Sequence, residues 1–286
     1  MIDIEQLRNR AKNIKLFATD LDGTLLDSKH TLKEVSKEAL ISLSQNGVIV
    51  AAATGRALTS LPDSVTSMES VKYLITANGA KIYLNSTGEL IYEKYLSEQA
   101  LDSVMHFFSE PNIMCEAFWD GIPHVEMYRY NDAKNYGIPK WFSDYFFQSR
   151  KPLENFFDAL RENMDKIENI NFVFGDEDVK KYVYDELYAN KHLYELTTSF
   201  PFNYEIGGIG VSKGTAVDFL AQRENILQEQ TICFGDNEND ISMIEYAGIG
   251  VATANAVPKA IEAADYVTED NENDGVAKAL AMLGLI

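Results

Sequence analysis

Continuous apolar segments alternate with helical segments at both ends of the chain, and this alternation constrains the fold more than any other feature. Near the N-terminus, strands are predicted within residues 14–19, 48–55 and 71–80. Near the C-terminus, "TICFG", "IGVA" and "DYVT" are predicted strands separated by helices. Strands that are apolar throughout are buried on both faces, which is typical of a parallel sheet covered by helices on each side. The sequence therefore predicts an α/β fold with a doubly wound parallel sheet.

The first predicted helix has recognisable ends. In "TLKEVSKEALISLSQNG", Thr31 and Glu34 have the spacing of a capping box. Apolar residues then recur with helical periodicity, and Gly47 is placed to end the helix. The apolar face is expected to consist of Leu32, Val35, Ala39 and Leu43.

The middle of the chain differs in composition, because 26 of the 32 aromatic residues lie between Tyr83 and Tyr204. The segments "IMCEAFWDG", "IPHVEMYRY" and "INFVFGD" are predicted strands, with helices near 97–109, 154–163 and 176–190. We therefore predict a Rossmann-like core formed by residues 1–82 and 208–286, with an inserted α+β domain at 83–207. The alternative is one large domain with an aromatic half.

Charge and composition exclude several classes of function. The chain has 25 Lys and Arg against 44 Asp and Glu, a net charge of −19. This lack of basic residues argues against nucleic-acid and anionic-membrane partners. No signal-peptide core or long apolar run is present, which favours a cytoplasmic protein. Two cysteines give no disulfide framework, and four histidines without close pairing make a zinc site unlikely on sequence grounds.

The first predicted strand ends in two carboxylates, Asp20 and Asp22, within "KLFATDLDGTLLDS". On an extended chain residues i and i+2 point the same way, so both acids can reach one site beyond the carboxyl end of the strand. Ligands bind at that edge in open α/β sheets. Two close negative charges resist desolvation, so a positive partner is expected. A calcium loop is excluded, because Leu25 and Thr31 replace its required Gly and Glu.

Two further segments follow predicted strands or begin helices. "AAATGR" places Thr54 and Gly55 at the end of the second strand, where a hydroxyl and backbone N–H groups could hold an anion. "GVSKGTAV" places Lys213 at a helix start, where it could neutralise a phosphoryl group. It is not a P-loop, because Ser212 precedes the lysine in place of Gly.

The last polar segment, "FGDNENDISM", gathers Asp236, Glu238, Asn239 and Asp240 after the "TICF" strand. Ile241 occupies the position at which a calcium loop needs Gly. Two acidic strand ends at one sheet edge make an oxygen-rich site fit for Mg²⁺, a hard cation that retains waters and phosphate oxygens as ligands.

These motifs together resemble a known family. "DLDGTLL", "TGR", "SKG" and "GDNEND" are similar, in order, to the four motifs of the haloacid dehalogenase (HAD) superfamily. "ANGAKIY" and the C-terminal "GIGVATANAVPKAIEAADYVTEDNENDGVAKAL" resemble its Cof-type sugar-phosphatase branch. The position of the inserted segment implies a C2-type cap. One departure is Thr253-Ala254, where this branch often has Met-Gly.

The resemblance implies a phosphatase that hydrolyses small phosphorylated metabolites, sugar phosphates above all. Asp20 would be the nucleophile that forms an aspartyl-phosphate, and Asp22 the general acid and base. Mg²⁺ would be held by an Asp20 oxygen, the backbone carbonyl of Asp22, and Asp236. Asp240 would lie behind these ligands, near Lys213 or a metal-bound water.

The resemblance also implies the residues that bind the substrate. The phosphoryl oxygens would be bound by Thr54, Gly55, Lys213 and Asn239. Glu238 is expected to be a solvated turn residue. A closing cap would exclude water and read the leaving group. Its candidate residues are Trp119, His124, Arg129, Lys140 and Trp141, although so many aromatic residues more often form a core.

Two other functions remain open at this stage. A phosphotransferase or mutase would use the same aspartyl-phosphate with a sugar hydroxyl as acceptor. The other is a non-catalytic phosphosugar-binding protein, which a replacement of Asp20 or Asp22 would have favoured; both acids are present. A dinucleotide-dependent oxidoreductase is disfavoured, because no G-x-G-x-x-G follows the first strand.

Overall fold

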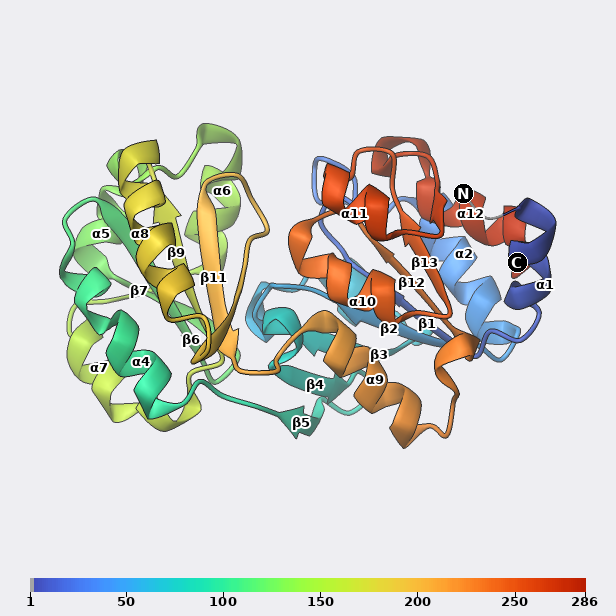
Figure 1. The fold of residues 1–286 in the computed structure, drawn as a ribbon, viewed down its shortest axis with the longest axis horizontal. Helices are drawn as coiled ribbons and strands as arrows, with labels where there is room; N and C mark the ends of the chain where they lie inside the picture. The colour runs from blue at the N-terminus through green and yellow to red at the C-terminus, as the bar shows by residue number, and fades with distance from the viewer. Residues whose placement is uncertain (1–2) are drawn as a thin grey trace. The chain divides into compact units, whose positions relative to one another are not determined.

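A computed structural model describes residues 3–286, which divide into two compact units (Figure 1). The core unit comprises the described residues up to Gly55, Leu61–Tyr92 and Ser212–Ile286. The inserted unit comprises Arg56–Ser60 and Glu93–Val211.

The core unit is built on an eight-stranded sheet of order β14-β13-β12-β1-β2-β3-β4-β5. Pairing is parallel from β14 through β3 and antiparallel between β3 and β4. The strands are β1 (Leu16–Thr19), β2 (Ile49–Ala53), β3 (Val71–Thr76), β4 (Lys81–Leu84), β5 (Glu89–Glu93), β12 (Thr231–Gly235), β13 (Ile249–Ala252) and β14 (Tyr266–Val267). The helices are α1 (Ile4–Ala11), α2 (Glu34–Gln45), α3 (Asp63–Thr66), α9 (Lys213–Arg223), α10 (Ile241–Tyr246), α11 (Pro258–Ala263) and α12 (Gly275–Leu283).

Helices cover both faces of this sheet, as the apolar strands predict. Val217 and Leu220 of α9 and Met243 of α10 pack on one face, against alternate strand residues such as Leu16. Phe17 follows Leu16 and therefore points to the opposite face, on which Figure 1 shows α2 and α12. The predicted doubly wound parallel sheet is confirmed.

The first predicted helix begins later than its sequence pattern suggests. It starts at Glu34 with Lys33 as the N-cap, and no side chain caps it, so the predicted Thr31 and Glu34 capping box is wrong. Val35, predicted to be buried, is 51% exposed. Ala39 and Leu43 are buried as predicted, but Ser36 and Leu40 complete the buried face in place of Val35, since residues three and four apart share one face of a helix.

The predicted boundary after residue 82 falls inside β4, and the one after 207 falls inside β11 (Asn203–Gly208). β4 and β5 extend the core sheet beyond β3, so the core unit continues to Tyr92. Tyr92 packs its ring on Phe219 of α9, with centroids 4.8 Å apart. The rise in aromatic content therefore begins within the core unit, before the insertion does.

The inserted unit holds a six-stranded sheet of order β10-β11-β9-β6-β7-β8. Its strands are β6 (Ile113–Trp119), β7 (Ile122–Glu126), β8 (Lys151–Leu153), β9 (Asn169–Phe174), β10 (Tyr194–Thr197) and β11. Its helices are α4 (Glu98–Val104), α5 (Met127–Asn131), α6 (Lys140–Ser149), α7 (Phe156–Glu162) and α8 (Glu177–Ala189). In this sheet β10 with β11, β11 with β9, β9 with β6 and β6 with β7 pair antiparallel, and β7 with β8 pairs parallel, so the predicted α+β insertion is confirmed.

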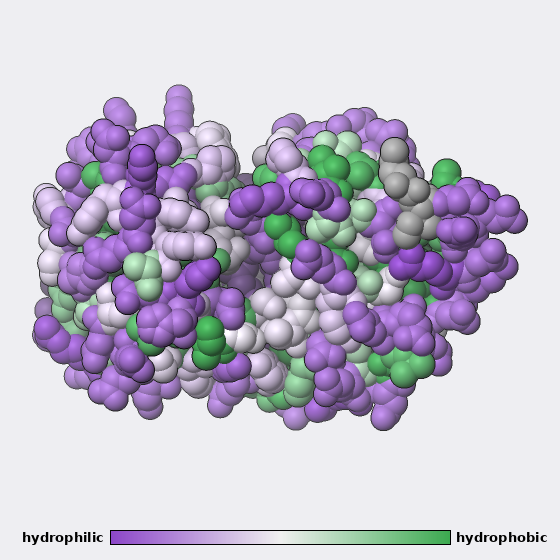
Figure 2. Space-filling view, in the orientation of Figure 1, coloured by the Kyte–Doolittle hydropathy of each residue, from purple (hydrophilic) through white to green (hydrophobic). Residues whose placement is uncertain are grey.

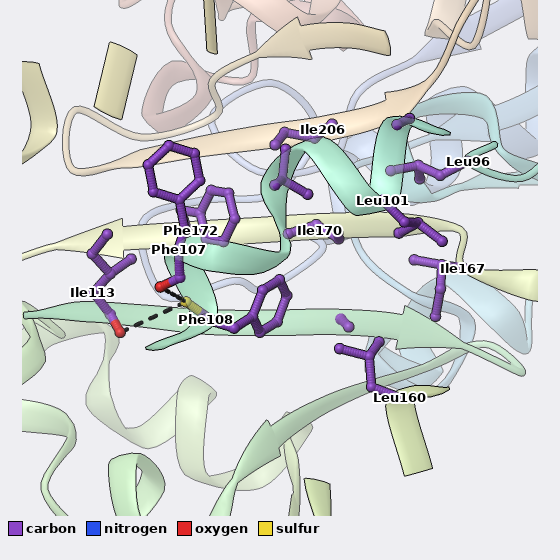
Figure 3. Packing of buried hydrophobic residues seen from close by; sticks show 14 of the residues in the cluster. Leu96, Leu101, Phe107, Phe108, Ile113, Leu160, Ile167, Ile170, Phe172 and Ile206 are labelled. Atoms are coloured by element: carbon purple, nitrogen blue, oxygen red, sulfur yellow. Dashed lines mark hydrogen bonds between the residues drawn. The ribbon is translucent and has the colours of Figure 1, made fainter. Parts of the chain in front are cut away.

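The aromatic residues of this unit mainly form its core. Phe107, Phe108 and Phe172 pack together with aliphatic residues between one sheet face and its helices (Figure 3). Cys115 is also buried in this cluster, and its sulfur contacts the carbonyl oxygens of Phe107 and Ile113. The predicted strand at 122–130 is only half right, because α5 begins at Met127.

The opposite face of the same sheet carries a buried polar row. Arg150 pairs with Glu116 through two bonds of 3.0 Å, and Asn171 donates to the same carboxylate at 2.9 Å. A buried charge pair of this kind is tolerated only when its hydrogen bonds are well satisfied.

In Figure 2 hydrophilic residues cover most of the visible face of each unit, and apolar residues are scattered. Among residues 3–286, no helix combines the length and apolar character needed to cross a bilayer.

Candidate active site

The predicted catalytic segments all lie at one edge of the core sheet. β1 pairs in parallel with β2 on one side and with β12 on the other. Asp20, Thr54 and Asp236 directly follow these three strands, so parallel pairing brings them to the same edge. The structure thus brings together residues that are more than 200 positions apart in the sequence.

Lys213 connects two of the acids. Its ammonium lies 2.6 Å from Asp20 Oδ1 and 2.6 Å from Asp240 Oδ1, and its side chain is fully buried. Ser212 is the N-cap of α9, and its side chain accepts a hydrogen bond from the Thr215 N–H. This cap fixes the start of the helix and so the position of Lys213, its first residue. Burial alone would lower the pKa of Lys213, but the two carboxylates outweigh it and hold the pKa above its ordinary value.

Asp240 is fixed at both carboxylate oxygens. While Oδ1 contacts Lys213, Oδ2 accepts from the backbone N–H groups of Asp236 at 2.9 Å and Asn237 at 3.0 Å. Because both oxygens are engaged, Asp240 is suited to orient Lys213 and the turn that carries Asp236.

Asp236 lies against the segment that follows β1. The Thr24 hydroxyl donates to Asp236 Oδ1 at 2.6 Å. Gly23 has a φ of +85°, and a Cβ built there would lie 2.5 Å from Asp236 Oδ2. Glycine is therefore required between the two acidic segments both for its backbone conformation and for space.

The site carries an excess of negative charge, because the carboxylates of Asp20, Asp22, Asp236 and Asp240 interact with one another and Lys213 contacts only Asp20 and Asp240 of them. Burial raises the pKa of Asp20 well above its ordinary value; Lys213 opposes this shift and the neighbouring acids add to it. Burial and the charge of Asp240 raise the pKa of Asp236 to about 7, although the hydrogen bond from Thr24 acts to lower it. One ammonium does not neutralise this cluster.

This donor set fits a divalent cation. One carboxylate oxygen from each of Asp20, Asp236 and Asp240 lies within 4.8 Å of the others, and all three residues are buried. Carboxylate oxygens are preferred ligands of Mg²⁺, and a bound cation would offset the charge that burial makes costly. The Asp22 side chain is not in this cluster: the metal-binding role predicted for Asp22 uses its backbone carbonyl, and its side chain is the predicted general acid and base.

The predicted phosphoryl-binding residues border the same edge. The Thr54 N–H donates to the Ile75 carbonyl at 2.9 Å, so the anion-binding role predicted here falls to its hydroxyl and to Gly55. Asn239 is buried, and its Nδ2 donates to Asn78 Oδ1 at 3.0 Å. Glu238 forms an exposed pair with Lys259 at 2.9 Å, in keeping with a surface turn.

Sequence reasoning missed two residues of the site, Asn78 and His30. His30 Nδ1 lies 2.7 Å from Asp22 Oδ1, and His30 has a positive φ of 57°. Neither spacing nor periodicity relates positions 22 and 30, because the intervening loop folds back through a bridge between Asp22 and Leu26. For Asn78, the one available signal was the Asn-Gly pair after β3, which is typical of left-handed turns.

The segment that departs from the family pattern also contacts the site. The Thr253 N–H donates to the Gly235 carbonyl at 3.2 Å, and Asn255 Nδ2 donates to the Gly23 carbonyl at 2.8 Å. Despite the change to Thr253-Ala254, this loop therefore still holds the turn after Asp22.

The candidate leaving-group residues have different surroundings within the inserted unit. Trp119 stacks on His124 with centroids 3.6 Å apart and an interplanar angle of 8°. Arg129 is buried and donates to the Phe108 and Glu110 carbonyls. Lys140 is exposed, and Trp141 is 62% exposed. Trp119, His124 and Arg129 therefore contribute to the fold of this unit, whatever else they do.

His124 gives a prediction for acid stability. Burial and the nearby Lys151 lower the pKa of His124 to about 4, from an ordinary value near 6.5. Between these pH values the unfolded chain binds a proton that the folded chain does not, so the unfolding free energy should fall as pH falls from 6.5. His124→Phe keeps an aromatic ring against Trp119 and should lose about 1–2 kcal/mol less stability between pH 7 and pH 5 than the wild type, after discounting for solvent screening.

Urea unfolding followed by tryptophan fluorescence measures this difference, because both tryptophans lie in the inserted unit. His106→Gln is the control, since the His106 side chain is 45% exposed. Equal pH dependence of wild type and His124→Phe would contradict the prediction.

Comparisons with known proteins agree with this geometry. Residues 17–280 match the model of the haloacid dehalogenase-like hydrolase family. The 5-amino-6-(5-phospho-D-ribitylamino)uracil phosphatase YcsE of Bacillus subtilis (strain 168) is 30% identical over 268 residues, covering 94% of this chain and 95% of that protein. Phosphatase YwpJ of the same organism is 30% identical over 286 residues, covering 94% and 100%.

Solved structures show the same architecture. A haloacid dehalogenase-like hydrolase from B. subtilis has a TM-score of 0.81 at 26% identity, covering 96% of this chain and all of that one. The HAD subclass IIB sugar phosphatase BT4131 has a TM-score of 0.79 at 25% identity, covering 95% and 100%. The family match spans the core motifs at both ends of the chain and the insertion between them. The chain belongs to the haloacid dehalogenase-like hydrolases, in their Cof-type branch, and is a phosphatase.

Proposed function

We propose that this phosphatase is Mg²⁺-dependent and hydrolyses small phosphorylated metabolites, sugar phosphates among them, through an aspartyl-phosphate on Asp20. The observation that carries the proposal is the buried contact of Lys213 with Asp20 and Asp240, beside the carboxylate of Asp236. A buried cluster with such an excess of acids is costly unless a cation offsets it, and a bound cation would in turn attract an anionic substrate.

In the first step Asp20 attacks phosphorus. Because Lys213 holds Oδ1, the attacking atom is Oδ2. The bond from Oδ2 to phosphorus forms as the ester bond breaks, and Asp22 gives a proton to the departing oxygen. His30, 2.7 Å from Asp22, helps to hold that carboxyl in place.

In the second step water attacks the phosphorus of the aspartyl-phosphate. Asp22 takes the proton from water, the bond to Oδ2 breaks, and inorganic phosphate leaves. Lys213, Asn239, the Thr54 hydroxyl and the Gly55 N–H bind the phosphoryl oxygens through both steps.

An Asp20 oxygen, the Asp22 carbonyl and Asp236 would hold Mg²⁺. When bound, the ion supplies positive charge that offsets the nucleophile and the phosphate together.

The test is a phosphate-release screen on the full chain with Mg²⁺. It covers sugar phosphates, pyridoxal phosphate, flavin mononucleotide and the phosphoribitylamino-uracil named for the B. subtilis relative. We expect release from at least one substrate, loss of release with a chelator, and recovery when Mg²⁺ is restored.

Three outcomes would overturn this proposal. One is the absence of phosphate release from every substrate in the presence of Mg²⁺, and another is hydrolysis that a chelator does not change. The third is phosphoryl transfer to an added sugar in place of phosphate release, which would indicate a phosphotransferase.

A further inference from the structure

Three consecutive residues after β3 adopt left-handed backbone conformations. The φ angles are 47° at Ala77, 56° at Asn78 and 104° at Gly79. Such angles are disfavoured for Ala and rare in succession, so the surroundings must hold this turn in place. All three residues are buried.

The turn contacts two of the segments to which phosphoryl binding is assigned. The Asn78 N–H donates to the Thr54 carbonyl at 3.0 Å. The Asn78 side chain accepts from Asn239 Nδ2 through Oδ1, also at 3.0 Å. Asn78 therefore connects the end of β2 with the acidic turn that follows β12.

The turn also abuts the segment that carries Lys213. A Cβ built on Gly79 would lie 2.3 Å from the carbonyl oxygen of Ser212, the residue before the lysine. Only glycine permits this close approach at a positive φ. The three residues thus touch all three phosphoryl-binding segments of the core unit.

We propose that Asn78 is a positioning residue that orients Asn239 toward the phosphoryl group; this rests on the role of Asn239 in the proposed function. A side-chain amide has two N–H donors on one side and a carbonyl acceptor on the other. The bond to Asn78 uses one donor of Asn239 and fixes the plane of its amide. The second donor is then available to a phosphoryl oxygen, whereas a flipped amide would present its carbonyl and repel that oxygen.

The experiment measures inorganic phosphate as a competitive inhibitor of the Mg²⁺-loaded enzyme, together with kcat and KM. Asn78→Gly removes the acceptor while tolerating the positive φ. We expect the inhibition constant for phosphate and KM to rise about tenfold, the effect of one hydrogen bond to a charged group. We expect kcat to fall by a smaller factor.

A double-mutant cycle shows whether Asn78 acts through Asn239. If it does, the variant that combines Asn78→Gly with Asn239→Ala should bind phosphate as weakly as Asn239→Ala alone. Additive losses in the double variant, or a wild-type inhibition constant in Asn78→Gly, would overturn the inference.

A pair of glycine variants tests the turn itself. Gly79 and Gly88 both have positive φ, but a Cβ on Gly88 meets nothing within 4 Å. Both changes to Ala strain the backbone, and only Gly79→Ala should weaken phosphate binding. Equal inhibition constants in the two folded variants would count against the turn as a positioning element.

If Gly79→Ala does not fold, the double-mutant cycle of Asn78→Gly with Asn239→Ala still tests whether Asn78 orients Asn239. Failure of the proposed function would look different: the wild type would then release no phosphate from any substrate in the presence of Mg²⁺.

Discussion

Asp20→Asn should abolish phosphate release, with a loss of about 10⁴-fold or more in kcat, the scale seen when a nucleophile is removed. An amide cannot form the aspartyl-phosphate, yet it has the size of the carboxyl and can still contact Lys213. Removing one charge from a cluster with too many acids should leave folding intact, because burial already raises the pKa of Asp20. Steady-state phosphate release and the thermal unfolding midpoint measure the two effects.

The matched control for Asp20→Asn is Glu238→Gln, the same kind of change at an exposed acid of the site's own turn. It should keep near wild-type turnover. Intact-protein mass spectrometry of the quenched wild type should detect a phosphoryl adduct that Asp20→Asn lacks. Clear turnover by pure Asp20→Asn would remove Asp20 from the role of nucleophile.

Lys213→Met is expected to affect stability and activity together. Methionine has nearly the length of lysine without its charge, so Asp20 and Asp240 would be left buried without their shared counterion. Removing one partner of a buried ion pair costs about 3–5 kcal/mol. The loss should appear in urea unfolding without divalent cation and should shrink when Mg²⁺ is added. Turnover should fall by about 10³-fold, as the phosphoryl group loses a direct positive contact.

A second variant separates the two effects of Lys213→Met. Adding Asp240→Asn removes one uncompensated charge, so it should recover part of the stability and none of the activity. Lys259→Met is the control, because its pair with Glu238 is exposed and should change stability by less than about 1 kcal/mol. If Lys213→Met were as stable as the wild type, the buried contacts of Lys213 would not have the energetic weight assigned here.

The sequence predicted the parts of this molecule that follow from local chemistry. Apolar strands that end in polar residues, such as β1 before Asp20 and β12 before Asp236, indicated both a parallel sheet and the edge where the site lies. The structure confirms that sheet and brings the two acids together. Their catalytic roles remain predictions.

What the sequence did not predict depends on contacts between distant segments. The aromatic content that begins at Tyr83 suggested a domain boundary, but Tyr92 belongs to a strand of the core sheet and packs on α9. The capping-box spacing predicted Thr31 as the N-cap, but the N-cap is Lys33 and the helix begins two residues later than predicted. His30 and Asn78 entered the site through loops with positive φ, which no periodicity reveals.

One feature of the inserted unit bears on any attempt to transplant it between relatives. Residues 56–60 belong to this unit although they precede the long insertion, and Thr59 bonds to the Gly121 carbonyl through both its N–H and its hydroxyl, each at 3.0 Å. Gly121 lies in the tight turn between β6 and β7, where Asp120 also has a positive φ. A chimera that exchanges only residues 93–211 would separate the β6–β7 hairpin from its own residues 56–60. The hairpin would then contact the corresponding segment of the recipient protein. An intact transplant of the inserted unit therefore has to carry residues 56–60 together with residues 93–211.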